Sequence, residues 1–307
     1  MGEYMNLDYT NIEKYIDSSK VKYDEPMNKH TTMKVGGSAD VLVIPENIQD
    51  VINTLKFAKE NGIPVTVIGN GSKLLVLDKG IRGIVIKFGS KFSNVQIDGE
   101  YITVDAGMTL PRLAIIAKDN SLSGLEFAAG IPGNVGGAVY MNAGAYGSEM
   151  SNVIEEVTYL DEDLNIKTIT NIECNFAYRK SMFRETNKVI LSAKLKLNSG
   201  NKKEIEELMK QNNEARRTKQ PLEYPNAGST FKRPEGYFVG KLIDDLGLKG
   251  YQIGDAQVST KHSGFIVNKG KATAKDVTEL INYIKKKVLE AYGVLLEEEI
   301  IVLGEEK

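Results

Sequence analysis

The chain has 307 residues, and its 39 lysines and arginines against 41 aspartates and glutamates give a formal net charge of −2, which excludes a general polyanion-binding surface. Cys174 is the only cysteine and the two histidines are far apart, so a disulfide within the chain and a cysteine-based zinc site are excluded, and no metal site is expected. The apolar share of 41% suits folded domains, and the polar first 20 residues lack the apolar stretch of a signal peptide, so we expect a cytoplasmic protein with no nucleic-acid or membrane partner.

The first 120 residues are predicted to alternate strands and helices around a β-α-β unit. Asn47–Asn61 carries apolar residues three and four apart, the spacing of an amphipathic helix. In chain order the predicted elements are a helix over Tyr9–Ile16, a strand over Ala39–Ile44, the helix over Asn47–Asn61, strands over Pro64–Ile68, Leu74–Leu77, Gly83–Phe88 and Tyr101–Asp105, and a helix over Thr109–Lys118 with Pro111 in its first turn.

A glycine-rich block follows these elements. Of the 29 glycines, 14 fall in residues 69–150, and Phe127–Ser148 carries no charge over 22 residues. This stretch is long enough to span a bilayer, but its six glycines and Pro132 are unfavourable in a helix surrounded by lipid. The pattern therefore indicates backbone that turns sharply or approaches something closely.

The second half is predicted to contain two further regions, divided by the polar stretch Asn198–Lys203. The long helix has Thr273 as its N-cap and a single apolar face, which consists of Val277, Leu280, Ile281, Ile284 and Val288. In chain order the predicted elements are a hairpin of Val153–Leu160 and Ile166–Ile169, a strand over Lys188–Leu197, a helix over Lys203–Lys219, a loop over Pro221–Ser229, a helix over Tyr237–Leu246, a strand over Gly264–Asn268, the long helix over Thr273–Tyr292 and a central final strand over Val294–Leu303.

Two small-residue loops are candidates for binding phosphate. Gly69-Asn70-Gly71-Ser72 directly follows a predicted strand, and its backbone N–H groups could form a phosphate-binding concavity or only a tight turn. Gly130–Ala138 has four glycines in nine residues, but it matches neither the Rossmann fingerprint nor the P-loop. Tight backbone packing and a pyrophosphate-bearing ligand both remain open for this second loop, and two such loops favour a ligand of dinucleotide size.

Three further positions could carry chemistry, each with a structural alternative. Arg179 could hold a carboxylate with its planar fork, or it is a surface cation. Ser229 could be a turn former or a proton donor, but it lacks the partners of a nucleophile. In Glu297–Glu299, strand alternation would place Glu297 and Glu299 on one face, either as a solvated edge or as acids carried into a buried site that favours their neutral form.

Basic groups near the end of the helix over Lys203–Lys219 give a weaker signal. Arg216 and Lys219 complement the helix dipole there, and they could also bind an anionic substrate group. The pair Lys261-His262 is similar, although a lone histidine such as His262 is more often structural than catalytic.

Taken together, these stretches resemble one family, the UDP-N-acetylenolpyruvoylglucosamine reductases, flavoenzymes of bacterial cell-wall precursor synthesis. The resemblance covers about residues 30–303 in the family's order. Its matching stretches are His30–Asp40, Gly69–Ser72, Gly130–Gly147, Tyr178–Ser181, Ala227–Phe231, Gly247–Gly250, Val258–Asn268 and Leu296–Ile300. Only eight residues separate Arg179 from the strand over Lys188–Leu197, so the chain is similar to the shorter subtype, which has no extra substrate-closing loop.

The resemblance implies an α+β fold, in which a two-part FAD-binding domain of the vanillyl-alcohol-oxidase (PCMH) type precedes a C-terminal α+β substrate domain. It implies an N-terminal helical segment over 1–30, the FAD domain over 31–199 with its division near 70–80, and the substrate domain over 200–307. It also implies non-covalent FAD, NADPH as co-substrate, a UDP-sugar enolpyruvyl ether as substrate and a monomer. Through cell-wall synthesis, such an enzyme would serve cell shape, the cell cycle and division.

The implied chemistry has two half-reactions. NADPH first reduces FAD, and reduced FAD then passes a hydride to the methylene carbon of the enolpyruvyl ether. By resemblance, Arg179 and Glu299 stabilise the enolate-like charge, Ser229 protonates the neighbouring carbon, and Arg216 and Lys219 bind substrate phosphates. The residues that the resemblance assigns to FAD are Gly69, Asn70, Gly71, Ser72, Ile131, Pro132, Gly133, Val135, Gly136, Gly137 and Asn142.

The sequence departs from the family pattern at Lys73, where an asparagine is common, and this change could alter flavin contacts. Two other functions remain as alternatives. The chain could be another flavin oxidoreductase on the same scaffold, against which the retention of Arg179, Ser229 and Glu299 argues. It could also be a nucleotide-binding module without turnover.

Overall fold

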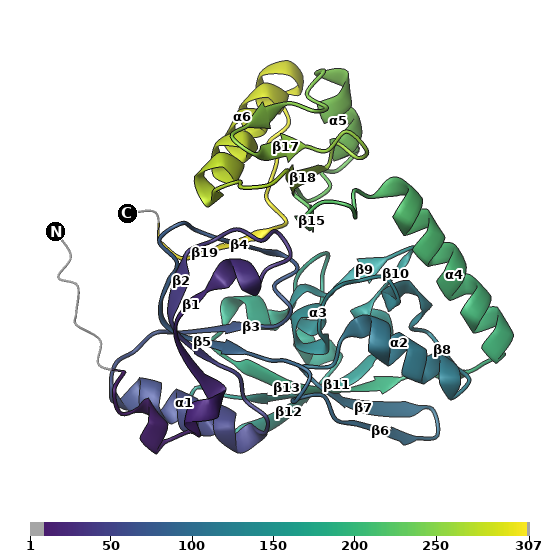
Figure 1. Cartoon of the computed structure of the whole chain (residues 1–307). Helices are drawn as coiled ribbons and strands as arrows, with labels where there is room; N and C mark the ends of the chain where they lie inside the picture. The colour runs from purple at the N-terminus through teal and green to yellow at the C-terminus, as the bar shows by residue number, and fades with distance from the viewer. Residues whose placement is uncertain (1–8, 306–307) are drawn as a thin grey trace. The chain divides into compact units, whose positions relative to one another are not determined.

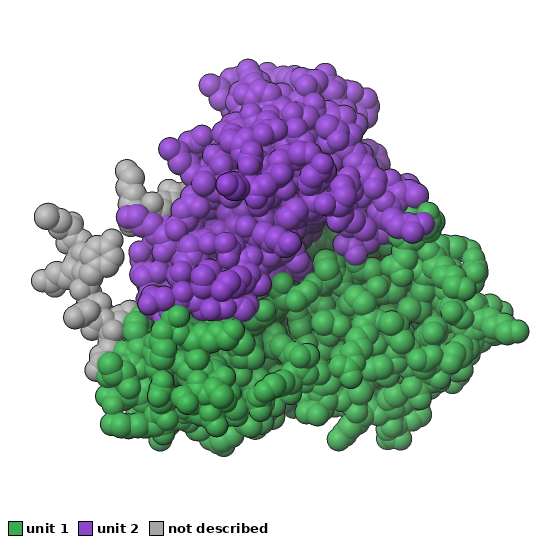
Figure 2. Space-filling view, viewed as in Figure 1, with its two compact units in different colours: residues 1–23, 41–70, 83–215 green, residues 24–40, 71–82, 216–307 purple. Residues whose placement is uncertain are grey.

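The computed structural model describes residues 9–305, so residues 1–8 of the predicted N-terminal segment lie outside the described residues. The chain divides into two compact units, which Figure 2 colours separately. Unit 1 comprises residues 1–23, 41–70 and 83–215, and unit 2 comprises residues 24–40, 71–82 and 216–307. Unit 2 thus joins two early segments to the C-terminal region, whereas the predicted domains follow chain order. The predicted domain limits remain a prediction about functional domains.

Antiparallel pairing dominates the larger sheet of unit 1 (Figure 1). This five-stranded sheet has the order β12 (Ile166–Thr170), β11 (Ile154–Leu160), β13 (Val189–Lys196), β7 (Tyr101–Asp105) and β6 (Val95–Asp98). Leu160 pairs with Ile166, which confirms the predicted hairpin. Two short ribbons pair β9 (Gly144–Ala145) with β10 (Ser148–Glu149) and β8 (Leu122–Ser123) with β14 (Asn198–Ser199).

A four-stranded sheet has the order β1 (Val21–Pro26), β2 (Ser38–Val43), β5 (Ile81–Lys87) and β3 (Val65–Ile68). β3 and β5 run parallel, and β2 and β3 are joined by helix α1 (Ile48–Glu60), as expected for the predicted β-α-β unit. The Asn47 side chain caps α1 by accepting a hydrogen bond from the Asp50 N–H.

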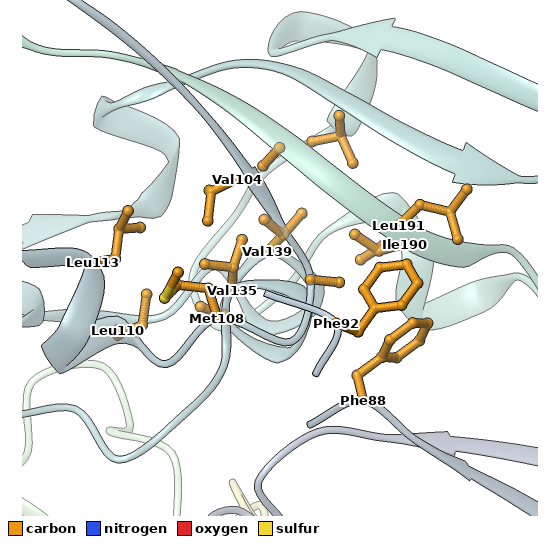
Figure 3. Close-up of a cluster of buried hydrophobic side chains, with 14 of the residues drawn as sticks. Phe88, Phe92, Val104, Met108, Leu110, Leu113, Val135, Val139, Ile190 and Leu191 are labelled. Carbon is orange, nitrogen blue, oxygen red and sulfur yellow. The ribbon is translucent and has the colours of Figure 1, made fainter. Parts of the chain in front are cut away.

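Three more helices begin in unit 1: α2 (Leu110–Asp119), α3 (Val135–Met141) and α4 (Lys202–Lys219). Helix α3 lies inside the uncharged glycine-rich block, where the sequence predicts no helix. Figure 3 shows Val135 and Val139 of α3 pointing into a buried cluster with Val104 of β7 and Leu191 of β13. Because a seven-residue helix is marginal by itself, this packing stabilises α3 and thereby fixes the backbone at its N-terminus.

Seven short 3-10 helices lie in the described chain: η1 (Ile12–Lys14), η2 (Ser18–Lys20), η3 (Met27–Lys29), η4 (Glu126–Ala128), η5 (Met150–Asn152), η6 (Ile172–Cys174) and η7 (Met182–Glu185). The predicted helix over Tyr9–Ile16 is wrong in extent, because only the turn η1 forms there, with Ile12 buried. Cys174 is fully buried at the end of η6, and burial raises the pKa of its thiol to about 11, so the thiol is unreactive at neutral pH.

Unit 2 has its own apolar core, formed around helix α6 (Ala274–Tyr292). Thr273 caps α6 in a capping box with Asp276, and the five predicted apolar residues of its face are all buried, so this prediction is confirmed. The face packs on a four-stranded sheet and against α5 (Val239–Asp245) (Figure 1). The order of the sheet is β15 (Asn226–Ser229), β18 (Phe265–Asn268), β17 (Ala256–Val258) and β16 (Gln252–Ile253).

Two predictions for unit 2 are wrong. The expected loop Pro221–Ser229 ends in strand β15, which pairs with β18. The expected central strand Val294–Leu303 is reduced to β19 (Ile301–Leu303), which pairs in parallel only with β4 (Leu74–Val76) in a two-stranded sheet. The reason is a bend before β19, where the N–H groups of Glu299 and Ile300 both point to the Thr230 carbonyl and break strand alternation.

No helix among residues 9–305 is long and apolar enough to cross a membrane.

Candidate functional site

The first small-residue loop follows β3 and exposes consecutive backbone donors. Among residues 9–305, the N–H groups of Asn70, Gly71 and Ser72 have no hydrogen-bond acceptor. Gly71 has a φ of +65°, and a Cβ built on it would lie 2.0 Å from the His30 carbonyl oxygen, so no side chain fits there. Successive unpaired N–H groups of this kind form an anion-binding surface.

The second loop lies beside Asn70, the last residue of the first loop that belongs to unit 1. The Asn70 Nδ2 donates to the Pro132 carbonyl at 2.7 Å, which joins the two loops. The N–H groups of Gly133 and Asn134 have no acceptor within the described chain, and the buried Asn134 Oδ1 has no hydrogen-bond partner among the described residues. Because such an orphaned buried acceptor is costly, it indicates that a ligand donor meets it.

Two residues predicted to bind FAD have backbone donors that are already used. The Val135 N–H donates to the Met108 carbonyl at 2.8 Å, and the Gly136 N–H donates to the Ala106 carbonyl at 2.9 Å. The N–H groups of these two residues are therefore not available to a ligand, and their predicted role in binding FAD remains a prediction. Gly137, in contrast, is exposed on α3, and a Cβ built on it would have nothing within 4 Å.

Asn142 connects the glycine-rich block to the loop that carries Arg179. Its Nδ2 donates to Glu149 Oε1 at 2.8 Å and to the Ala177 carbonyl at 3.1 Å, and its Oδ1 accepts from the Ser151 N–H at 2.9 Å. The side chain is fully buried and its hydrogen-bonding groups are occupied by protein. Asn142 therefore positions the Arg179 loop, and its predicted contact with FAD gains no support from this geometry.

Arg179 has an unusual backbone, with a φ of +55°. Non-glycine residues avoid this region, and such strain gathers at functional sites. Its carbonyl accepts from Arg184 Nη1 at 3.0 Å, its Nη2 donates to the Gly144 carbonyl at 3.2 Å, and its guanidinium lies 4.9 Å from the centre of the Tyr178 ring. The described chain from Arg179 to β13 contains η7 and no long loop, in agreement with the shorter subtype.

In unit 2, two chain segments bring Ser229 and Glu299 together. Ser229 ends β15, and the next residue, Thr230, accepts hydrogen bonds from the N–H groups of Glu299 at 2.8 Å and Ile300 at 3.5 Å. The Ser229 Oγ makes no hydrogen bond to any described residue, so the hydroxyl is available to a ligand. The structure therefore joins two of the three predicted catalytic residues, while Arg179 belongs to unit 1.

Each of the three consecutive glutamates has its own lysine. Glu297 pairs with Lys232 at 2.9 Å, and Glu298 pairs with Lys285 at 2.8 Å. Glu299 pairs with Lys73 at 2.8 Å. The predicted shared face of Glu297 and Glu299 is wrong, because the Glu297 side chain is 67% exposed and that of Glu299 only 7%. The bend before β19 turns Glu299 inward by itself.

Lys73 makes contacts that the sequence did not predict, since the sequence suggested only an effect on flavin contacts. Besides Glu299, its Nζ donates to the Ser229 carbonyl at 2.7 Å. The main chain of Lys73 also accepts from the Ile301 N–H at 2.8 Å. Its departure from the family pattern was the one signal in the sequence that could have pointed to this position.

The basic end of α4 is ordered by its neighbours. Arg216 Nε donates to Gln220 Oε1 at 3.0 Å, and Lys219 is exposed. The Lys261 ammonium donates to the Arg217 carbonyl at 2.7 Å, at the C-terminal end of the helix where a cation complements the dipole. The exposed Lys219 could meet an anionic ligand group.

His262 has a structural role in the turn before β18. Its Nδ1 accepts from the Gly264 N–H at 3.1 Å, which requires an unprotonated Nδ1, and its ring contacts the Phe265 ring edge to face. Burial lowers the pKa of this imidazole below its usual 6.5, opposed by the Asp244 carboxylate and aided by the Lys249 ammonium.

We expect His262 to make the protein less stable in mild acid. Because the folded pKa is lowered, the unfolded chain binds the proton first, and the free energy of unfolding falls as the pH drops through 6.5 towards the folded pKa. His262→Gln should therefore lose less thermal stability than the wild type between pH 7.5 and pH 5.5. Equal losses, measured by circular dichroism melting, would contradict this assignment.

Comparisons with known proteins show which family this chain belongs to. The model for the C-terminal domain of UDP-N-acetylenolpyruvoylglucosamine reductase matches residues 220–303, and an FAD binding domain matches residues 39–170. A UDP-N-acetylenolpyruvoylglucosamine reductase of Caldanaerobacter subterraneus is 49% identical over 96% of this chain and 97% of that protein. One of Clostridium tetani is 47% identical over 100% of this chain and 99% of that protein. The chain belongs to the UDP-N-acetylenolpyruvoylglucosamine reductases.

A solved structure agrees with this assignment. The crystal structure of UDP-N-acetylenolpyruvylglucosamine reductase from Thermus caldophilus is 38% identical, covers 92% of this chain and 98% of that one, and has a TM-score of 0.79. The family resemblance and the α+β fold with an FAD-binding and a C-terminal domain are thus confirmed. The reductase is an FAD-containing oxidoreductase, as the sequence predicts.

Proposed function

We propose that this reductase converts the enolpyruvyl ether of UDP-N-acetylglucosamine to UDP-N-acetylmuramate, with NADPH as the hydride donor. The observation that carries the proposal is the grouping of Ser229, the buried Glu299 carboxylate and the Lys73 ammonium in unit 2, where the ammonium contacts both the Ser229 carbonyl and the Glu299 carboxylate. This group combines a hydroxyl that can give a proton with charges that can act on an enolate, which is what reduction of such a carbon–carbon double bond needs.

The fit of FAD to unit 1 rests on Asn70 of the first loop and on the second loop. Unpaired N–H groups at Asn70 and Gly133–Asn134 suit a pyrophosphate, and the orphaned Asn134 Oδ1 suits a ligand donor. Neither loop contains a histidine or a cysteine, which supports non-covalent binding. When bound, FAD supplies the transfer of a hydride equivalent from NADPH to the methylene carbon of the enolpyruvyl ether.

Ser229 is proposed as the proton donor. Addition of hydride to the methylene carbon leaves negative charge on the neighbouring carbon and its carboxylate, and the Ser229 hydroxyl delivers the proton that completes the reduction. Solvent then returns a proton to the serine oxygen. A hydroxyl without a protein acceptor is suited to this task, because it keeps its proton for the substrate.

Arg179 and Glu299 are proposed to stabilise the enolate-like charge. The Arg179 guanidinium can hold the substrate carboxylate with two parallel hydrogen bonds. For Glu299, the role requires either a proton on the carboxyl group or a cation that offsets its charge, since a bare carboxylate would repel the enolate. Arg216 and Lys219 are proposed to bind the substrate phosphates.

In the cell, we place this reaction in peptidoglycan precursor synthesis in the cytoplasm, where it would serve cell-wall biogenesis and, through it, cell shape, the cell cycle and division. The protein is proposed to act as a monomer. The family names of its relatives support the place of the reaction in peptidoglycan precursor synthesis.

One spectrophotometric experiment tests the proposed function. The purified protein should be yellow, NADPH should bleach its absorbance near 450 nm, and the enolpyruvyl UDP-sugar should restore the colour in the absence of oxygen. If the sugar does not restore the colour while oxygen does so rapidly, the chain is a different flavin oxidoreductase. A protein that binds FAD but is never bleached by NADPH would instead be a binding module.

A further inference from the structure

We infer that Lys73 is a positioning residue for Ser229 and Glu299, and that its ammonium is the cation that offsets the Glu299 charge when the substrate is reduced. The inference rests on the proposed function of these two residues. It concerns the one residue of the first loop region where the sequence departs from the family pattern, and it follows from contacts that all lie within unit 2.

The ammonium of Lys73 joins two segments that are far apart in sequence. Its Nζ donates to the Ser229 carbonyl at 2.7 Å across 156 positions, and it lies 2.8 Å from Glu299 Oε1. One ammonium group therefore contacts both the backbone of the proposed proton donor and the carboxylate of the proposed charge stabiliser. A single cation can hold both because ammonium has three donors.

The main chain of Lys73 also contacts the segment that contains Glu299. Its carbonyl accepts from the Ile301 N–H at 2.8 Å, at the start of the parallel pairing between β4 and β19. Gly228 leaves room for the side chain, since a Cβ built on this glycine would lie 3.3 Å from the Lys73 Nζ. Backbone and side chain together thus set where Lys73 places its charge.

The other two lysine–glutamate pairs show what distinguishes Lys73. The Glu297 and Glu298 side chains are 67% and 31% exposed, so water screens their charge and their lysines matter little. Glu299 is 7% exposed, and a buried carboxylate without its cation is costly and keeps its full repulsion towards a second negative charge nearby. Glu299 therefore needs the Lys73 cation to offset its charge, whereas Glu297 and Glu298 do not need Lys232 and Lys285.

The geometry also links the ammonium to the first loop. Lys73 directly follows Ser72, the last residue of the loop proposed to hold the FAD pyrophosphate, and it begins the run into β4. A movement of that loop would shift the ammonium and, with it, Ser229 and Glu299. The arrangement assigns to Lys73 a role in the substrate half-reaction and none in the reduction by NADPH.

The test compares Lys73→Met with Lys285→Met in the FAD-loaded protein. Each change removes the cation of a 2.8 Å ion pair in the same glutamate run, but only the first concerns the buried carboxylate. Rapid mixing should show bleaching by NADPH within about twofold of the wild type for both variants. Recolouring by the enolpyruvyl UDP-sugar should be about 10- to 100-fold slower in Lys73→Met and unchanged in Lys285→Met.

Three further measurements separate positioning from general damage. Lys73→Arg, which keeps the cation, should recover most of the recolouring rate. Glu299→Gln should slow recolouring less in the Lys73→Met background than in the wild type. In that background it removes a carboxylate charge that no cation offsets. In D2O, the product of Lys73→Met should contain both configurations at the newly protonated carbon by NMR, because a displaced Ser229 lets solvent deliver deuterium from either face.

The outcomes distinguish this inference from the proposed function. If Ser229→Ala recolours at the wild-type rate, the proposed function fails first. If Ser229→Ala is slow but Lys73→Met matches Lys285→Met in rate and product configuration, only the inference about Lys73 is overturned. Should Lys73→Met lose FAD or melt far below the wild type, Lys73→Gln is compared with Lys285→Gln instead, and equal recolouring rates overturn the inference in the same way.

Discussion

Ser229→Ala is expected to leave bleaching by NADPH unchanged and to slow recolouring by the enolpyruvyl substrate by about 1000-fold. The reason is that a positioned general acid contributes about 10²- to 10⁴-fold, and alanine offers no proton. The Ser229 hydroxyl makes no hydrogen bond to a described residue, so its removal breaks no protein contact, and we expect an unchanged melting temperature. Rapid-mixing absorbance at 450 nm measures both half-reactions on one sample.

The matched control is Ser259→Ala in the same unit. The Ser259 hydroxyl accepts from the backbone N–H groups of Lys261 and His262, so its loss affects a turn and no proposed chemistry. We expect this control to be somewhat less stable and to recolour at the normal rate. Wild-type recolouring by Ser229→Ala would show that another group, or water, supplies the proton.

The parts of the fold set by local physics could be predicted from the sequence. Helix α6 begins at Ala274 after the Thr273 cap and buries its predicted face, because the cap and the 3.6-residue period are encoded in neighbouring residues. The hairpin of β11 and β12 was predicted for the same reason, since a polar turn joins two adjacent strands. Neither prediction requires knowledge of contacts between residues that are far apart in the sequence.

The end of the chain could not be predicted, because distant contacts set it. The run Glu297–Glu299 has the composition of a strand edge, yet the Thr230 carbonyl accepts from two successive N–H groups and bends the chain there. Glu299 turns inward as a result, and its partner Lys73 comes from a segment that no local pattern connects to it. Sequence reasoning therefore identified Glu299 as a candidate but gave the wrong reason for its burial.

The glycine content indicated where the two loops lie in the sequence, but it did not indicate the local structure around them. The clustering of glycines indicated the two loops, and the structure joins them through Asn70 and Pro132. The same content hid α3, because seven residues with two glycines have little helix propensity and are stabilised by buried packing. Which N–H groups of the second loop remain available could be read only from the structure.

Gly137→Leu is expected to remove FAD from the protein without destabilising the protein itself. Gly137 is exposed on α3 with nothing within 4 Å of a built Cβ, so the Cβ of a leucine has room there, and the change should stabilise the helix by up to about 1 kcal/mol. If FAD lies along the second loop as proposed, the new side chain occupies its place, and affinity for FAD should fall by at least about tenfold. The purified variant should be colourless, with an apo melting temperature equal to or above that of the wild type.

The neighbouring glycine supplies the opposite control. A Cβ on Gly136 would lie 2.9 Å from the Ala106 Cβ, so Gly136→Ala should lower the stability of the apo protein by about 1 to 3 kcal/mol through overpacking. Adjacent positions thus separate two causes of a lost cofactor: a blocked ligand surface at Gly137 and a strained fold at Gly136. A Gly137→Leu protein that retains its full 450 nm absorbance would place FAD away from this face of α3.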